Sequence, residues 1–203
     1  GVSDLAVGAP RDDAGGRDRG AVHILFMNTD GSVDSTVEIN ENTANGPVLS
    51  YNDDYFGSSV ANIGDLNGDG VNDLVVGAKG AGDGGAVHIL FMNTDGSVDS
   101  TVEINENTAN GPVLSRFDYF GSSVANIGDL NGDGVSDIVV GAPYDDAGTR
   151  WSTDRGAVHI LFMNTDGSVD STVEINDNTA NGPVLSDTDV FGSSVANIGD
   201  LNG

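Results

Sequence analysis

The sequence predicts an all-β protein made of tandem four-stranded antiparallel units, and three observations support that fold class. Residues 21–50 and 86–115 are identical, and residues 157–186 differ from both only at Asp177. Within each copy, apolar residues alternate with polar ones or form short runs, which indicates strands. Thirty glycines, many of them in Asp-Gly and Gly-Pro steps, are typical of tight turns between strands.

Each unit has the sequence pattern of four strands joined by turns. Along one module we expect these strands at residues 58–63, 74–76, 86–92 and around Val102. Small and β-branched residues favour the first strand, a continuous apolar run favours a buried second strand, and alternation favours the last two. The turn at 93–96 ends in Asp-Gly, which accepts the positive φ of a tight hairpin.

The units are counted from the Gly-Val pair that follows each acidic loop. On that count they cover residues 1–69, 70–133 and 134–203. Differences in length fall in two segments of the unit, one after a Gly-Ala pair and one before a Phe-Gly pair. Insertions at fixed points of a repeat map to loops on one face of the array.

A four-stranded antiparallel unit that repeats radially is the blade of a β-propeller. Such sheets must hide their faces against their neighbours. Closed propellers usually have about four to eight blades, so three units are too few for a ring. We therefore expect the three modules to be part of a larger ring or of an open, filamentous array.

The composition excludes several classes of partner and site. The chain carries a net charge of −25, from 32 acidic and 7 basic residues. That charge repels phosphate-rich partners, which argues against nucleic acid and anionic lipid. There is no cysteine, so disulfides and thiolate metal sites are excluded. No run approaches the roughly 18 apolar residues of a membrane helix, so we expect no membrane insertion.

Each unit carries an acidic loop of the form D-x-N-x-D-G-x-x-D. The loop is complete at residues 65–73 and 129–137, whereas the third copy is divided between residues 200–203 and 1–4. Oxygen ligands at alternate positions suit a hard cation with six to eight ligands, and the glycine at the sixth position allows a sharp bend. The alternative is a bare turn, which does not need so many carboxylate and amide oxygens. The pattern therefore favours bound calcium (Ca²⁺) with a structural role.

Two short motifs frame these loops. Phe56-Gly57 precedes Gly77-Ala78-Lys79 by about 20 residues, and Phe120-Gly121 precedes Gly141-Ala142-Pro143 in the same way. This order resembles the FG-GAP repeat of integrin α-subunit propellers and of many microbial surface proteins. The resemblance covers essentially the whole chain, although Lys79 replaces the expected proline. It implies four-stranded blades that hold Ca²⁺ between their first two strands, in an extracellular or cell-surface protein.

The resemblance also implies which residues bind the ion. In each loop the ligands are side chains at alternate positions together with one main-chain carbonyl. Asparagine at the third loop position, where family members often have aspartate, removes one charge and should weaken binding somewhat. The implied ligands are Asp65, Asn67, Asp69, Val71 and Asp73 in the first site, Asp129, Asn131, Asp133, Val135 and Asp137 in the second, and Asp200, Asn202, Val2 and Asp4 in the divided third.

The variable segments are the best candidates for contact with a partner. Tyr144, Arg150, Trp151 and Arg155 lie in the longest of them. Such residues stack on sugar rings or dock into neighbouring protein surfaces. An aromatic side chain that only anchors its own loop explains Trp151 equally well.

Nothing in the repeats points to catalysis. No Ser-His-Asp order recurs, and there is no glycine-rich phosphate loop or isolated carboxylate pair. His23, His88 and His159 recur at one position of the unit. We expect them to be packing residues, because equivalent positions in separate blades lie too far apart to share an ion. We therefore expect no enzyme activity.

The leading hypothesis is an extracellular, calcium-stabilised structural or adhesive protein that assembles with itself, head to tail, into a surface array or fibre. The near-identity of the copies supports it, because a polymer reuses one interface. The alternative is a module of a closed propeller whose variable loops bind a glycan or a cell-surface protein.

Overall fold

The computed structural model describes residues 1–146 and 154–201, and it confirms the all-β prediction. No helix occurs in these two ranges. The eleven strands follow the alternating and apolar runs of the sequence. They are β1 (Leu5–Ala9), β2 (Ala21–Met27), β3 (Val33–Ile39), β4 (Phe56–Gly64), β5 (Asp73–Ala78), β6 (Ala86–Met92), β7 (Val98–Ile104), β8 (Ser123–Gly128), β9 (Asp137–Ala142), β10 (Ala157–Met163) and β11 (Val169–Ile175).

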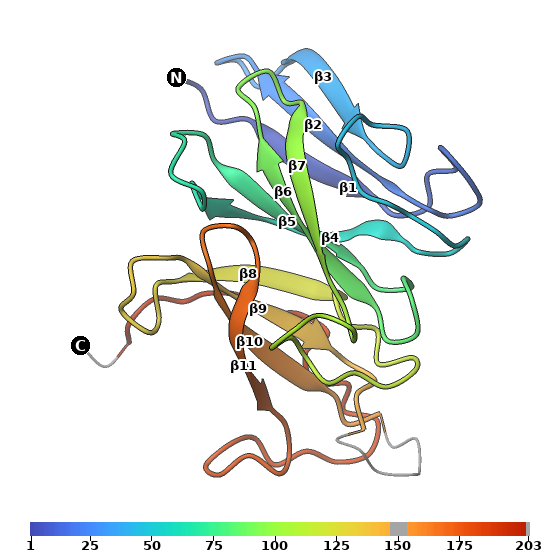
Figure 1. The fold of residues 1–203 in the computed structure, drawn as a ribbon, viewed down its shortest axis with the longest axis vertical. Coiled ribbons are helices and arrows are strands. Elements are labelled where there is room, and N and C mark those ends of the chain that lie inside the picture. Colours follow the sequence, from blue (N-terminus) through green and yellow to red (C-terminus); the bar gives the residue numbers. More distant parts are fainter. Residues whose placement is uncertain (147–153, 202–203) are drawn as a thin grey trace.

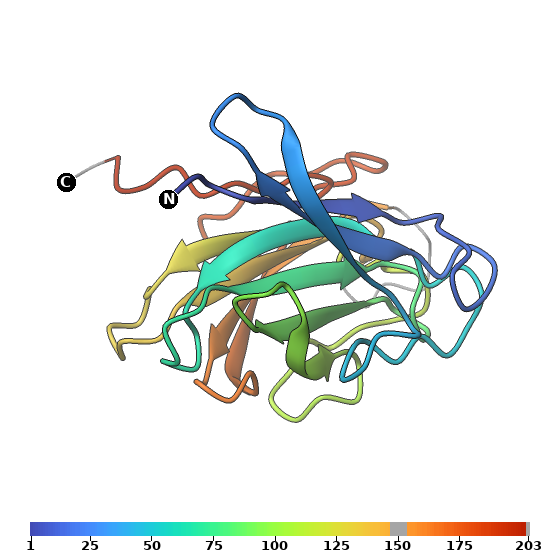
Figure 2. The same ribbon diagram turned by 90° about the horizontal axis from the view of Figure 1, so that it is seen from above.

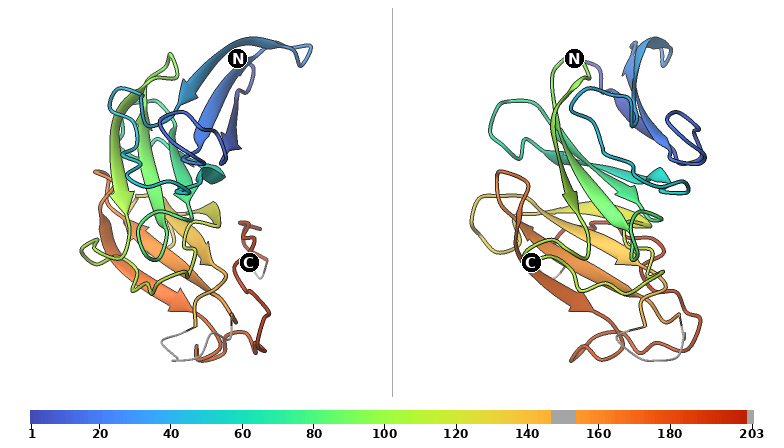
Figure 3. Two further views of the ribbon diagram at one scale, coloured as in Figure 1. Left: turned by 90° about the vertical axis from the view of Figure 1, so that its right-hand side faces the viewer. Right: turned by 45° about the vertical axis from the view of Figure 1, so that its right-hand side comes forward.

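The strands form three antiparallel sheets that follow one another along the longest axis of the molecule (Figure 1). The orders are β1-β2-β3, β4-β5-β6-β7 and β8-β9-β10-β11. Seen from the side, the sheets lie along an arc, as expected of successive propeller blades (Figure 3). The first sheet differs from the expected four strands because the sequence that forms β4 and β8 occurs for the third time only at 191–203, after the third sheet.

The hairpins have the turns that the sequence predicts. In the β6–β7 hairpin, Gly96 N donates to Asn93 O at 3.0 Å and Asn93 N donates to Ser97 O at 2.9 Å. Gly96 has φ +80°, which explains why glycine stands there. The equivalent turn between β2 and β3 projects beyond the neighbouring sheets (Figure 2).

Successive sheets are joined by a close backbone contact between the Gly-Ala pair of one sheet and the Phe-Gly pair at the start of the next. A methyl group placed on Gly77 would lie 1.9 Å from the carbonyl oxygen of Gly121, which is inside van der Waals contact. The hydroxyl of Ser59 donates to that same oxygen at 2.8 Å. A parallel bridge between Gly85 and Phe120 continues the contact. The glycines are therefore required by the distance between units.

The apolar core lies between the sheets rather than inside any one of them. One cluster joins the first and second sheets and includes Phe56, which is fully buried. The other joins the second and third sheets and includes Phe120, also fully buried. Because each sheet buries apolar residues against a neighbouring sheet, one unit alone has no complete core.

The recurring histidines are packing residues where a unit is complete. His88 is 1% exposed and meets the ring of Phe56 edge-on, with 5.5 Å between ring centroids. His159 makes the same contact with Phe120 at 5.5 Å. His23 is only half-buried, and no equivalent aromatic contact is recorded for it among the described residues. Burial lowers the pKa of His88 to about 4, because the low-dielectric core disfavours the charged ring.

We expect Gly77→Ala to destabilise the protein by about 2 to 3 kcal/mol, because the added methyl group meets a backbone oxygen rather than the end of a flexible side chain. Gly16→Ala is the matched control, since its nearest contact is the flexible side chain of Arg19 and its cost should stay below about 1 kcal/mol. Urea unfolding measures both. Equal costs for the two variants would show that the inter-unit contact is not tight.

We expect acid to weaken the fold through His88. Its folded pKa lies below that of the unfolded chain, so its contribution to stability is complete above about pH 6.5 and is lost as the pH falls toward 4. The shift corresponds to roughly 3 kcal/mol. His88→Leu should remove this part of the pH dependence in urea unfolding measured between pH 7 and pH 4. Parallel curves for the variant and the wild type would contradict the assignment.

Candidate functional site: the acidic loops

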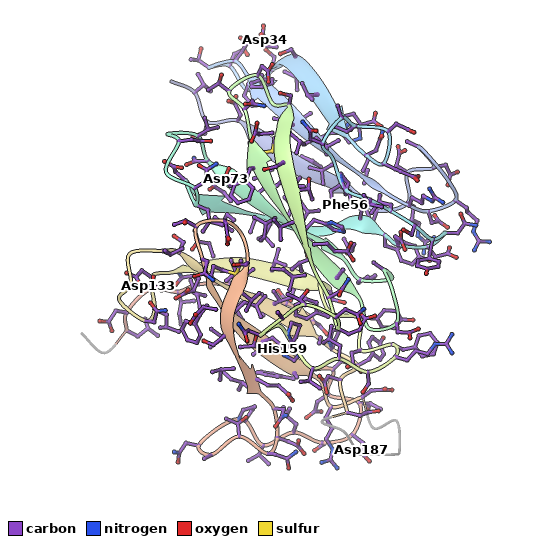
Figure 4. All side chains as sticks on the ribbon, viewed as in Figure 1. Asp34, Phe56, Asp73, Asp133, His159 and Asp187 are labelled. Carbon is purple, nitrogen blue, oxygen red and sulfur yellow. The ribbon has the colours of Figure 1, made fainter. Side chains whose placement is uncertain are left out.

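The two complete acidic loops lie at the same end of their sheets. The loop 65–73 connects β4 to β5, and the loop 129–137 connects β8 to β9. Figure 4 places Asp73 and Asp133 on this side, whereas Asp187 lies at the opposite end, which the variable segments occupy. The structure therefore separates a loop end rich in carboxylates from an end that varies between units.

The first loop is closed by its own hydrogen bonds. Asp65 accepts three main-chain N–H groups, from Gly68 at 2.8 Å, Asp69 at 2.9 Å and Gly70 at 2.8 Å. Asp69 accepts from the N–H of Val71 at 2.8 Å. Each carboxylate therefore holds the residues that follow it in a turn by accepting their N–H groups. This explains why aspartate and glycine recur at these positions.

The second loop repeats this geometry. Asp129 accepts from the N–H groups of Gly132 at 2.6 Å, Asp133 at 3.1 Å and Gly134 at 2.8 Å. Asn131 donates to Asp133 at 2.8 Å, as Asn67 donates to Asp69 at 2.9 Å. Two loops with different surroundings thus adopt one conformation, so the sequence pattern itself determines it.

The last aspartate of each loop is buried and connects the loop to the sheet. Asp73 is fully buried, and its two oxygens accept from Leu66 N at 2.9 Å and Met92 N at 3.1 Å. Asp137 is also fully buried and makes the same pair of bonds. Burial raises the pKa of Asp73, and the charge of Asp69 raises it further. A cation bound beside these carboxylates would relieve that repulsion.

The donor set of each loop suits a calcium ion, but its carboxylates face the loop's own N–H groups. Within 1–146 and 154–201, no group of three or more acidic or histidine side chains is gathered in a way that could hold a metal ion. Asp65, Asn67 and Asp69 are exposed at the loop surface and can turn toward an ion, whereas Asp73 is held by the sheet. The residues present therefore fit Ca²⁺ by their chemistry.

The residues of the divided third loop lie apart within one chain. Val2 and Asp4 precede β1 in the first sheet, whereas Asp200 follows the third sheet, and the two chain ends lie at different levels of the stack (Figure 1). Asn202 lies outside the described residues. Asp4 still accepts from Met27 N at 2.9 Å, as Asp73 does from Met92 N. Asp4 therefore keeps this contact with the sheet in the absence of residues equivalent to 65–69 beside it.

The variable end contains a groove of about 370 Å³ between the units. Tyrosines from all three units and two cationic side chains line it, and none of its lining residues is acidic. The lining residues are Pro10, Arg11, Tyr55, Ser58, Lys79, Tyr119, Ser122 and Tyr144. In a chain of net charge −25, such a groove is locally favourable for an anion.

The predicted partner-binding residues have different surroundings. Tyr144 lines the groove and meets Tyr119 edge-on, with 5.2 Å between centroids. Arg155 lies outside the groove lining and pairs with Asp177 and Asp187. These carboxylates raise the pKa of Arg155. Arg150 and Trp151 lie outside the described residues.

Sequence reasoning missed a group of buried charges beneath the variable end. Asp118 is 3% exposed, and its pKa is raised to about 7, mainly by burial and also by the charge of Asp145. Asp145 lies 3.4 Å from the Nε2 atom of the buried His159. The signal in the sequence is an aspartate two residues before every Phe-Gly pair, and its carboxylate caps the preceding turn, as Asp118 does by accepting from Ser115 N at 2.6 Å.

Comparison with known proteins agrees with this geometry. The family model described as FG-GAP repeat matches residues 56–90 and 120–161, which span the Phe-Gly pair, the acidic loop and the Gly-Ala pair of two units. These are FG-GAP repeats. The structure explains the matched pattern, because its Phe-Gly and Gly-Ala pairs form the contact between FG-GAP units.

The FG-GAP units are similar to integrin α-subunits. The chain is 38% identical to integrin alpha-3 of Cricetulus griseus over 149 residues, which is 71% of this chain and 12% of that protein. It is 38% identical to integrin alpha-6 of Gallus gallus over 152 residues, 72% of this chain and 12% of the relative. Integrin alpha-4 of Xenopus laevis is 30% identical over 176 residues, 85% and 16% respectively. The chain thus spans a small part of these relatives' length.

The part of the chain that the structure describes contains no helix long and apolar enough to cross a membrane.

Proposed function

We propose that this chain is part of an extracellular, non-catalytic adhesive protein whose FG-GAP blades are stabilised by Ca²⁺. Its copies associate head to tail through the surface that joins its own units, into a surface array or a fibre. The similarity to integrin α-subunits supports an adhesive role at the cell surface. The observation that carries the proposal is the repeated acidic loop, with the same hydrogen bonds at 65–73 and 129–137.

The role of the bound Ca²⁺ is to reduce electrostatic repulsion between the acidic sheets. Sheets that carry a net charge of −25 repel one another when they stack, and divalent ions at the loops reduce that repulsion where the carboxylates are densest. In the first site we assign Asp65, Asn67, Asp69 and Asp73 as side-chain ligands, with the carbonyl of Val71. The equivalent residues Asp129, Asn131, Asp133, Asp137 and Val135 form the second.

We expect Ca²⁺ to raise the melting temperature, because a ligand that binds only the folded state stabilises it by about 2.7 kcal/mol at 100 times its Kd. Differential scanning calorimetry with calcium and with a chelator measures the shift. The double variant Asp65→Asn, Asp129→Asn should lose most of it, whereas Asp99→Asn, at an exposed position of β7, should keep it. An equal shift in both variants would rule out the loops as the calcium sites.

A second candidate function is recognition of an acidic glycan at the variable end. The groove that contains Lys79 and Arg11 between Tyr55, Tyr119 and Tyr144 favours it. Tyrosine rings stack on sugar rings, and the two cationic side chains match a carboxylate-bearing sugar. No ion pair is recorded for Lys79 among the described residues, so its ammonium group is available for an anion.

We expect the wild type to bind oligosaccharides that contain uronic acid more tightly than their neutral counterparts. Lys79→Glu should weaken that binding at least tenfold by reversing a charge in the groove, and Lys79→Arg, which keeps the charge, should largely retain it. Titration calorimetry with both sugars makes the comparison. Indifference to the Lys79→Glu change would count against glycan recognition in this groove.

A further inference from the structure

Each complete acidic loop contains an Asn-Gly step at its surface. The steps are Asn67-Gly68 and Asn131-Gly132, and all four residues are exposed. The side-chain amide carbon of an asparagine is an electrophile, and the main-chain nitrogen of the next residue is close enough along the chain to attack it. Glycine favours this attack, because it has no side chain to obstruct a close approach of the backbone.

The loop conformation places a hydrogen-bond donor on the oxygen of each of these side chains. The Oδ1 atom of Asn67 accepts from the N–H of Asp69 at 2.9 Å, and the Oδ1 atom of Asn131 accepts from the N–H of Asp133 at 2.9 Å. Attack on an amide carbon develops negative charge on this oxygen, and a fixed donor stabilises that charge. Both asparagines therefore have a preorganised donor where the charge develops.

An aspartate is also placed to take the proton from the attacking nitrogen. Gly68 N donates to Asp65 Oδ1 at 2.8 Å, and Gly132 N donates to Asp129 Oδ1 at 2.6 Å. An amide nitrogen attacks as its proton leaves, so a carboxylate that accepts this N–H can act as a general base. A methyl group built on either glycine meets no atom of the described residues within 4 Å, so the backbone has room to move toward the side chain.

The Asn-Gly steps in the turns after β3, β7 and β11 have different surroundings. Their glycine nitrogens donate to a main-chain carbonyl, as Gly46 does to Thr43 at 3.0 Å, and a methyl group on Gly46 would lie 2.8 Å from the Cβ atom of Thr43. Within the described ranges, the side-chain bond recorded for these asparagines is from Asn110 Nδ2 to Val169 O at 3.4 Å, which places no donor on the side-chain oxygen. The three steps are Asn45-Gly46, Asn110-Gly111 and Asn181-Gly182, and their asparagines are exposed like those of the loops.

We propose that each complete acidic loop catalyses the deamidation of its own asparagine, Asn67 in the first loop and Asn131 in the second. In the first loop, Gly68 N attacks Asn67 Cγ while Asp65 accepts the proton from Gly68 N. The bond between Cγ and Nδ2 then breaks, and Nδ2 takes up this proton and leaves as ammonia. The product is a cyclic succinimide that joins Asn67 to Gly68.

Water then opens the succinimide at one of its two carbonyl carbons. Addition at the former side-chain carbon gives aspartate, and addition at the main-chain carbon gives isoaspartate. Either route exchanges one ammonia for one water and needs no oxidant or cofactor. Aspartate adds a carboxylate at the third loop position, whereas isoaspartate lengthens the main chain by one carbon and displaces the N–H groups that Asp65 accepts. For the calcium role proposed above, on which this consequence rests, the first product strengthens the ligand set and the second disrupts it.

Timed peptide mapping of the folded chain measures the reaction at every Asn-Gly step in one sample. The chain is incubated at neutral pH with a chelator, and mass spectrometry follows the conversion of amide to acid and distinguishes aspartate from isoaspartate. We expect Asn67 and Asn131 to convert roughly tenfold faster than Asn45, Asn110 and Asn181. In urea, which unfolds the loops, this difference should disappear.

The variant Asp65→Asn tests the general base with an internal control. It keeps the size of the side chain and removes the carboxylate, so conversion at Asn67 should slow roughly tenfold while conversion at Asn131 stays unchanged. Asp129→Asn should give the reciprocal result, and Asp99→Asn, at an exposed position of β7, should change neither rate.

Conversion in the loops no faster than in the turns would overturn the proposal, and so would an Asn67 rate that Asp65→Asn leaves unchanged. Because a chelator is present throughout, neither result depends on bound calcium. The melting shift with calcium tests the calcium proposal separately.

Discussion

The structure depends on how closely the backbones of successive units approach each other. At each junction, the Gly-Ala glycine of one sheet faces the carbonyl oxygen of the Phe-Gly glycine in the next, at a distance that leaves no room for a side chain. That contact sets the spacing between sheets, and the spacing lets Phe56 and Phe120 fill the space between them. A chain with few large aromatic residues can therefore form a packed core at each junction.

The acidic surface opposes the stacking of the sheets, whereas the repeated contact between sheets favours it. Stacking brings carboxylates on neighbouring sheets together, and the loops concentrate them at one end of the blades. Within each loop, main-chain N–H groups partly compensate the charge, as the three bonds to Asp65 show. Asp73 and Asp137 then transmit the conformation of the loop to the sheet, because each is bonded to the strand that lies third in its blade. Ion binding at the loops would thereby stabilise the sheets themselves.

The two ends of the blades differ in sequence variation for a physical reason. At the loop end the sequence is almost invariant between units, because nearly every residue makes a turn or a hydrogen bond on which the blade depends. At the variable end the segments differ in length and carry all seven lysines and arginines of the chain. The tyrosine-lined groove therefore occurs where the sequence can change without breaking the contact between units.

The sequence by itself determined the strands, the turns and the loop conformations, because these depend on residues close together in the chain. Alternation at 86–92, Asp-Gly at 95–96 and the Asp and Gly pattern at 65–73 all produced the expected local structure. Only the tertiary structure decided which segments become strands in full. The sequence Phe-Gly-Ser-Ser-Val-Ala-Asn-Ile-Gly forms β4 at 56–64, and its identical copy at 191–199 is not a strand beyond its first bridge. A strand needs a partner edge for its hydrogen bonds, and position in the stack, which local sequence does not encode, determines whether one is present.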